Sequence, residues 1–151
     1  MKIRNAKIQD VKQIHDLVST YAEMDRMLFR SYADIYENLQ TFLVAENDKN
    51  ILGCCALQII WQDLAEIKSL AVAQNQKGKA IGKKLVNQAA QKARLLGIKK
   101  VFALTLEPGF FEKVGFQKID RTLLPMKVWS DCAVCPKQDH CDEIAFIKKL
   151  D

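Results

Sequence analysis

The sequence has no apolar stretch long enough to cross a membrane. Its longest apolar run, Ile51 to Trp61, falls well short of the roughly 20 residues that a membrane-spanning helix needs, and it contains Gln58. The first ten residues, Met1 to Asp10, lack the apolar core of a signal peptide. Internal repeats, low-complexity tracts and linkers are also missing. The 151 residues are therefore expected to form one cytoplasmic domain, residues 1–151, without a membrane partner.

Neither sign of charge dominates the chain. Lysine and arginine number 23 against 18 aspartates and glutamates, which gives a net charge of +5 and a pI of about 8.9. The basic residues are spread along most of the chain and no nucleic-acid-binding motif accompanies them, so no nucleic-acid partner is expected. The positive balance instead suits a small anionic ligand.

Cysteines are few and odd in number, which does not fit a disulfide framework. Five cysteines without a secretory signal indicate reduced thiols in a reducing cytoplasm. Three of them, Cys132, Cys135 and Cys141, lie with His140 in a C-terminal tail of about residues 125–141 and fit a structural zinc site. Two alternatives are open: reduced thiols that pack the tail against the last strand, or a redox-active C-x-x-C pair.

Apolar periodicity predicts alternating strands and helices. Val11, Ile14 and Val18 recur at helical spacing, and Cys54 and Cys55 on a strand are expected to face opposite sides in the core. The pattern predicts an α/β fold with a mixed, twisted sheet of about six or seven strands and helices on both faces. The expected strands cover residues 2–4, 41–46, 51–60, 64–72, 101–104, 116–119 and 142–148, and the expected helices residues 9–23, 31–39, 82–96 and 108–115.

A glycine-bearing loop follows the strand at residues 64–72 and opens a helix. Backbone amides of such a loop and of the helix N-terminus converge on phosphate oxygens, and the helix dipole favours the anion. Neither the G-x-x-x-x-G-K-[ST] loop nor the G-x-G-x-x-G fingerprint is present. The alternative is a plain connection with a solvated lysine face. The loop and helix start contain Gly78 and Gly82 with Lys77, Lys79, Lys83 and Lys84.

This loop resembles the acetyl-CoA loop of the GNAT acetyltransferases, written [RQ]-x-x-G-x-[GA], with Lys77 in place of Arg or Gln and Ala80 in place of the first Gly. Residues 110–116, F-F-E-K-V-G-F, resemble the family's late helix-to-strand signature. The resemblance implies a GNAT fold, acetyl-CoA as co-substrate and N-acetyltransferase activity. It assigns the cofactor to Leu70, Ala71, Val72, Lys77, Gly78, Lys79, Ala80, Ile81, Gly82, Lys83 and Phe111.

The expected central strand carries an acidic residue, Glu66, which is disfavoured in a buried strand. One interpretation is a general base that takes the proton of the acceptor amine. The other is a salt bridge with Lys68, its neighbour on the same face. Many members of the family place a tyrosine acid at the position of Phe111, whose ring has no hydroxyl. Thr105 is then the candidate acid, with capping of the next helix as the alternative.

Four segments resemble the acetyltransferase domain of bacterial N-acetylglutamate synthases. The resemblance implies that Arg30, in the segment that begins at Leu28, binds the α-carboxylate of glutamate and that the product enters arginine biosynthesis. Leu28 is counted with the substrate site, and Lys68 is a second candidate because an acidic amino acid needs cations. Arginine suits this role because its planar guanidinium binds a carboxylate in bidentate fashion. The alternative for Arg30 is a surface arginine beside a helix start. The four segments are residues 28–31 (L-F-R-S), 66–72, 101–105 with 110–111, and 123–125 (L-L-P).

Two departures from the synthases leave other functions open. The 151 residues contain no amino-acid-kinase-like domain, so feedback by arginine through such a domain is not expected. The last strand of the synthases carries an Arg-x-Ser contact for glutamate, where this sequence has Cys141-Asp142-Glu143. The alternatives are a GNAT enzyme for another amino acid or small amine, and a non-catalytic CoA-binding or metal-sensing module. A homodimer is compatible with each of these functions, the glutamate enzyme included.

Overall fold

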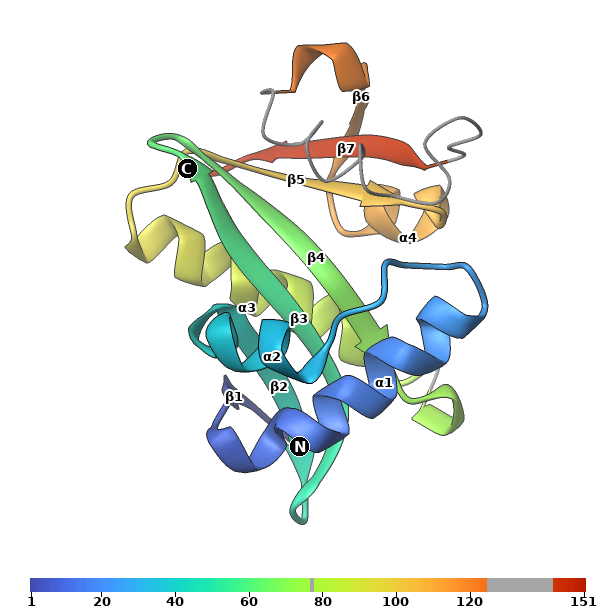
Figure 1. Cartoon of the computed structure of the whole chain (residues 1–151). Coiled ribbons are helices and arrows are strands. Elements are labelled where there is room, and N and C mark those ends of the chain that lie inside the picture. The colour runs from blue at the N-terminus through green and yellow to red at the C-terminus, as the bar shows by residue number, and fades with distance from the viewer. Residues whose placement is uncertain (77, 125–142) are drawn as a thin grey trace.

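The computed structural model describes residues 1–76, 78–124 and 143–151. It confirms the α/β fold, with a seven-stranded sheet in the order β1-β2-β3-β4-β5-β7-β6 (Figure 1). The β4–β5 pair is parallel and the other described pairs are antiparallel. The strands are β1 (Lys2–Asn5), β2 (Phe42–Asn47), β3 (Asn50–Trp61), β4 (Leu64–Val72), β5 (Lys100–Thr105), β6 (Gln117–Ile119) and β7 (Ile144–Lys149).

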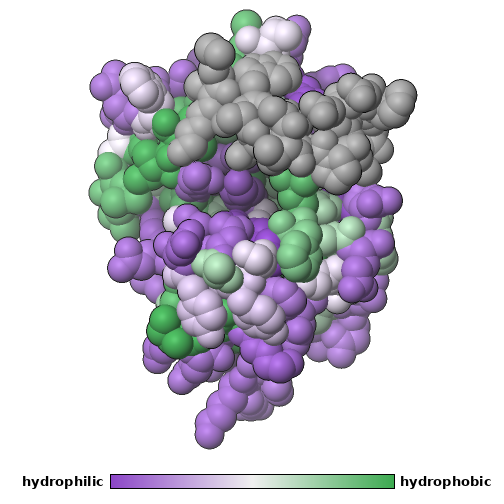
Figure 2. All heavy atoms as spheres, in the orientation of Figure 1, coloured by the Kyte–Doolittle hydropathy of each residue, from purple (hydrophilic) through white to green (hydrophobic). Residues whose placement is uncertain are grey.

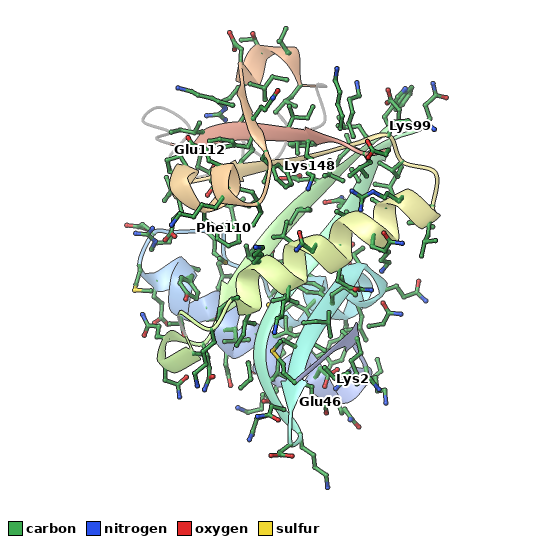
Figure 3. The ribbon with its side chains drawn as sticks, turned by 180° about the vertical axis from the view of Figure 1, so that it is seen from behind. Lys2, Glu46, Lys99, Phe110, Glu112 and Lys148 are labelled. Carbon is green, nitrogen blue, oxygen red and sulfur yellow. The ribbon has the colours of Figure 1, made fainter. Side chains whose placement is uncertain are left out.

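Helices cover both faces of the sheet, as the sequence predicts. On one face Val18 and Ile35 join the core beneath α1 and α2, and on the other Leu85 and Phe111 join the core beneath α3 and α4 (Figures 1 and 3). Cys54 lies in the first core and Cys55 in the second, which confirms their opposite orientation. The helices are α1 (Val11–Glu23), α2 (Tyr32–Glu37), α3 (Ile81–Leu95) and α4 (Pro108–Lys113).

Local signals in the sequence explain where the helices form. In α1, Val11, Ile14 and Val18 are fully buried because they recur on one side of the helix. The opposite side is polar, and the space-filling view shows mostly hydrophilic side chains there (Figure 2). The hydroxyl of Ser31 accepts from the Asp34 amide at 3.1 Å, so Ser31 is the N-cap of α2, as its residue type favours.

The helix boundaries differ modestly from the expected ones. The segment Ile8–Asp10 is a 3₁₀ turn ahead of α1, and Leu39–Thr41 is a second 3₁₀ turn after α2. Helical periodicity does not distinguish a 3₁₀ turn from the first or last turn of an α-helix, because both place residues three and four apart on one side.

The two parallel strands pair over only a short distance, and this positions the site. Leu64, Ala65 and Glu66 of β4 pair with residues 100–102 of β5, and the rest of β4 has no partner on that side among the described residues. Because the strands separate beyond Glu66, backbone groups of the second half of β4 are left facing a gap. The two parallel strands therefore splay apart at this end of the sheet.

Candidate active site

The gap between β4 and β5 opens into a cleft of about 840 Å³. Its lining includes the second half of β4, the end of β5, the start of α3, helix α4, and the connection between α1 and α2. Of the predicted site residues that the structure describes, Ala71 and Lys79 do not line the cleft. Those that do are Leu28, Arg30, Glu66, Lys68, Leu70, Val72, Gly78, Ala80, Ile81, Gly82, Lys83, Thr105 and Phe111.

A β-bulge decides which backbone groups of β4 face the gap. The amide of Ala73 donates to the carbonyl of Leu52 at 2.8 Å, and Ala71 pairs with Cys54 in the same register. Because backbone groups of alternate residues point to opposite sides of a strand, Ala71 faces β3, whereas Leu70 and Val72 face the gap. Of the three β4 residues that the resemblance assigns to the cofactor, Leu70 and Val72 therefore turn their backbone groups to the gap, and Ala71 does not.

The start of α3 has the geometry of an anion site. Ala80, its N-cap, adopts φ +62° and makes no side-chain cap hydrogen bond, so the amides of the first turn stay open toward the cleft. Gly78 also has a positive φ, +86°. A non-glycine residue rarely adopts this conformation, and Ala80 stands where the family pattern has glycine. The exposed cations around these amides are Lys79, Lys83 and Lys84.

Gly82 allows an aromatic ring to lie directly against the start of α3. A Cβ at this position would lie 3.3 Å from Cε1 of Phe110, which is tighter than ordinary contact. Phe111, which the resemblance assigns to the cofactor, is 5% exposed and packs edge-on against both Phe110 and Phe116. Phe110 is thus a wall of the cleft that the sequence analysis missed, although the residue stands beside Phe111 in the same motif.

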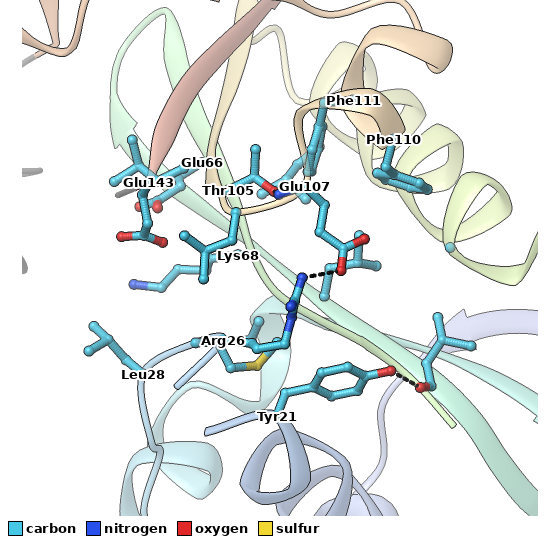
Figure 4. Close-up of a pocket in the computed structure, with 18 of the residues that line it drawn as sticks. Tyr21, Arg26, Leu28, Glu66, Lys68, Thr105, Glu107, Phe110, Phe111 and Glu143 are labelled. Carbon is cyan, nitrogen blue, oxygen red and sulfur yellow. Dashed lines mark hydrogen bonds and ion pairs between the residues drawn. The ribbon is translucent and has the colours of Figure 1, made fainter. Parts of the chain in front are cut away.

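Glu66 and Thr105 lie close to the point where β4 and β5 separate (Figure 4). Glu66 is only 6% exposed, and Thr105 is 9% exposed. The hydroxyl of Thr105 accepts from the Glu107 amide at 2.8 Å, which leaves its proton available for donation. Lys68 donates to Gln58 on β3 at 3.2 Å. A buried carboxylate and a hydroxyl in one cleft can take a proton from one reactant and give one to another.

Arg30 lies in the cleft with a guanidinium that is already oriented. Its Nε and Nη2 donate to the two carboxylate oxygens of Asp34 at 2.7 and 3.3 Å, and its Nη1 donates to the Ser69 hydroxyl at 3.1 Å. The guanidinium carbon lies 4.9 Å from the centre of the Phe42 ring. The sequence analysis missed Asp34 and Ser69, although the spacing of Arg30 and Asp34 is that of an i,i+4 ion pair.

Two further contacts tie α1 and the connection that follows it to the cleft (Figure 4). The Tyr21 hydroxyl donates to the carbonyl of Val72 at 2.5 Å. The Arg26 guanidinium forms an ion pair with Glu107, just past the end of β5. These contacts come from residues far apart in the sequence, so no local pattern predicts them.

Thiol chemistry has no support among the described cysteines. Burial raises the pKa of Cys54 to about 12 and raises that of Cys55 as well, so both thiols stay protonated near neutral pH. The predicted zinc ligands Cys132, Cys135 and Cys141, and the predicted loop residue Lys77, lie outside the described residues. Within residues 1–76, 78–124 and 143–151, no group of three or more histidines, cysteines or carboxylates fits a metal ion.

A search of the described residues for a membrane-crossing helix finds none of sufficient length and apolar character.

Comparisons with known proteins agree with this geometry. The family model described as "Acetyltransferase (GNAT) family" matches residues 8–116. An amino-acid acetyltransferase of Mycobacterium tuberculosis is 37% identical over 132 residues, which cover 85% of this chain and 75% of that protein. The structure of Rv2747 from the same organism, in complex with CoA, is 30% identical with a TM-score of 0.87, and the match covers 100% of both chains.

A longer enzyme shares the same fold. N-acetylglutamate synthase from Neisseria gonorrhoeae, complexed with coenzyme A and N-acetyl-glutamate, matches with a TM-score of 0.91 and 28% identity. The match covers 99% of this chain and 35% of that one. The chain therefore belongs to the GNAT acetyltransferase family and is an N-acetyltransferase that uses acetyl-CoA.

Proposed function

We propose that this N-acetyltransferase acetylates the α-amino group of an amino acid, L-glutamate, which is the N-acetylglutamate synthase reaction of arginine biosynthesis. The names of the relatives, amino-acid acetyltransferase and N-acetylglutamate synthase, support the proposal. The observation that carries it is the position of Arg30, an oriented cation in the same cleft as the buried Glu66. The carboxylate of an amino acid would bind Arg30, and its ammonium group would give a proton to Glu66.

The start of α3 and strand β4 form the end of the cleft that would bind acetyl-CoA. The open amides at residues 81–83, with Lys79 and Lys83 nearby, would hold the pyrophosphate. Leu70 and Val72 would pair with the pantetheine arm through the backbone groups that face the gap. The Leu70 amide would then polarise the thioester carbonyl, as an oxyanion-hole donor does. Lys77, which the resemblance adds to this set, remains part of the proposal.

The acceptor end supplies the proton transfers. Glu66 takes a proton from the acceptor ammonium, directly or through a water molecule, and the neutral amine attacks the thioester carbonyl carbon. The nitrogen of the tetrahedral intermediate then gives up its second proton to solvent, the C–S bond breaks, and the Thr105 hydroxyl gives its proton to the departing thiolate before recovering one from solvent. Arg30 holds the α-carboxylate, while Leu28 and Lys68 lie beside it in the wall of the cleft.

One observation favours a second candidate acceptor. Glu143 also lines the cleft, and the close-up places its carboxylate beside Glu66 and Lys68 (Figure 4). A second carboxylate at this end disfavours an acidic side chain and suits a hydrogen-bond donor. The alternative acceptor is therefore an amino acid whose side chain ends in an uncharged amide.

The direct test is acetyl-CoA turnover with a panel of free amino acids, followed by release of the CoA thiol. We expect kcat/KM for glutamate to exceed that for every other acceptor in the panel. Higher turnover with an amide side chain would favour the second candidate and retain the roles of Glu66 and Arg30. Turnover confined to amines that lack a carboxylate would contradict both assignments.

A further inference from the structure

Ser69 stands at a strained point of the central strand. Cys54 pairs with Ala71 and Ala56 pairs with Lys68, so two residues of β4, Ser69 and Leu70, lie opposite Cys55 alone. This is a β-bulge, and Ser69 adopts φ +52° within it. A left-handed backbone is unfavourable for a residue with a Cβ, and such residues persist where the surroundings or the function require them.

The side chain of Ser69 points to the oriented guanidinium of Arg30. The Nη1 group of Arg30 donates to Oγ at 3.1 Å, so the hydroxyl acts here as an acceptor and keeps its own proton for donation. Asp34 occupies the Nε side of the same guanidinium. Three of the five N–H groups of Arg30 are bonded within the described part of the chain, which leaves one on Nη1 and one on Nη2. Both Arg30 and Ser69 line the cleft.

We infer that the Ser69 hydroxyl and the two remaining N–H groups of Arg30 together bind the carboxylate of the acceptor. This inference rests on the proposed amino-acid acetyltransferase function and adds a second ligand to the carboxylate site. The hydroxyl is well suited because Arg30 fixes its orientation and a carboxylate accepts its proton in a charge-assisted hydrogen bond.

The bulge also links the carboxylate site to the reacting end of the cleft. Leu70, the residue after Ser69, turns its backbone toward the gap where the thioester would lie. Because consecutive Cα atoms are about 3.8 Å apart, the acceptor carboxylate is held one residue away from that position. This short separation selects acceptors in which a single carbon joins the amine and the carboxylate, so α-amino acids are acetylated and β-amino acids are not.

The test is Ser69→Gly, assayed with the preferred amino acid. Glycine removes the hydroxyl and adopts the left-handed backbone without strain, so the fold is retained and thermal stability does not fall. We expect the KM for the amino acid to rise about tenfold, as for the loss of one charge-assisted hydrogen bond. The KM for acetyl-CoA is expected to stay unchanged.

Two controls separate carboxylate binding from an effect on the bulge. The first is Ser69→Asn, which tolerates a left-handed backbone and keeps a donor, and should restore most of the acceptor affinity. The second is the same amino acid with its α-carboxylate converted to a carboxamide. For that acceptor, Ser69→Gly should change KM far less than it does for the parent amino acid, because the charged partner is gone.

Combination with Arg30→Gln gives an independent check. Both side chains bind one carboxylate in this proposal. The KM of the double variant for the amino acid should therefore rise by less than the product of the two single-variant increases. A fully multiplicative loss would contradict a shared carboxylate.

The remaining outcomes distinguish the two proposals. A fall in kcat with unchanged KM for the amino acid would show that Ser69 acts only through the bulge, and it would overturn the inference while the proposed function stands. Turnover confined to amines without a carboxylate would overturn both.

Discussion

Arg4 and Arg30 are similarly buried, with side chains 12% and 10% exposed, and each makes a two-point contact with an aspartate. Arg4 uses four N–H groups, on Asp10, Glu46 and the carbonyl of Asn5, and joins β1 to β2 and to the turn ahead of α1. Arg30 uses three and lines the cleft. The closed cluster, made of Arg4, Asp10 and Glu46, is therefore suited to hold the fold. The open cluster, made of Arg30, Asp34 and Ser69, is suited to bind a ligand.

The largest effect is expected at the reacting end of the cleft. Glu66→Gln removes the proposed base, so kcat/KM should fall about 10²- to 10⁴-fold while acetyl-CoA binding, measured by calorimetry, is retained. Glu46→Gln is the matched control, because it changes a strand carboxylate that contacts Arg4 and lies away from the cleft. A variant at Glu66 with normal turnover would contradict the assignment of the base.

Exchange of each arginine for lysine tests the comparison directly. Arg30→Lys keeps the charge but loses the planar fork, so KM for the amino acid should rise about 10- to 100-fold, and the loss of stability should be smaller than for Arg4→Lys because Asp34 is 40% exposed whereas Asp10 is 3% exposed. Arg4→Lys should leave KM unchanged and lower the free energy of unfolding by about 2 kcal/mol, because charged hydrogen bonds are lost. Steady-state kinetics and urea unfolding of both variants measure the two effects, and equal losses of stability would remove the distinction.

The closed cluster should dominate the acid side of the stability profile. Burial by itself would raise the pKa of Asp10, but hydrogen bonds from Arg4 and the Lys7 amide outweigh it and hold the pKa below its usual 3.8. A lowered pKa stabilises the fold above that value, and this contribution disappears as the pH falls through the folded-state pKa. The wild type should therefore lose stability below about pH 4.

The variant Asp10→Asn checks this dependence. It should be less stable than the wild type by about 2 kcal/mol at neutral pH, and the difference should shrink in acid. Urea unfolding at about pH 7 and pH 3 measures both points. Asp16→Asn serves as the control, since Asp16 is exposed and its contacts are a pair with Lys12 across one helical turn and a longer one with the neighbouring His15 at 3.9 Å. A pH-independent difference for Asp10→Asn would contradict the charge assignment.

The smallest effects concern backbone strain, which is present in the cleft and absent from the Arg4 cluster. The cleft contains Ser69 and Ala80 at positive φ, whereas Arg4, Asp10 and Glu46 have none. Ala80→Gly should raise the free energy of unfolding by about 0.5 kcal/mol, because relief of strain exceeds the added entropy of the unfolded chain. Gly78→Ala should lower it by about 1 kcal/mol, since no atom crowds that position and only φ is unfavourable. Denaturant unfolding measures both values. A change of the free energy of unfolding in the same direction for the two variants would contradict this account.

Several elements could be predicted closely from the sequence, for local reasons. The bounds of β4 match the expected 64–72 because a run of apolar residues there ends before a polar loop. The cap of α2 at Ser31 and the buried positions of α1 follow from residue type and helical spacing. The cleft residues Glu66, Thr105 and Arg30 were found because an acidic residue in a strand and matches to a family pattern are visible in the chain itself.

The contacts of those residues could not be predicted in the same way. Arg30 touches Ser69, 39 residues away, and Tyr21 touches Val72, 51 residues away. Such pairs depend on how the connection between α1 and α2 crosses the end of the sheet. Ala71, which was also expected to contact the cofactor, pairs with Cys54 and does not line the cleft, because the bulge at Ser69 sets which side of β4 each backbone group faces.

The sequence by itself determined the order of strands and helices, the glycine-bearing loop before α3 and the residues able to move a proton or bind a carboxylate. Periodicity and residue chemistry are local, so one chain is enough to read them. Only the tertiary structure decided that β4 and β5 separate beyond Glu66, that Ser69 takes a left-handed conformation, and that Arg30 is left with open donors. Those features arise from register and packing between distant segments, where the conformation of each residue is set by its neighbours in space.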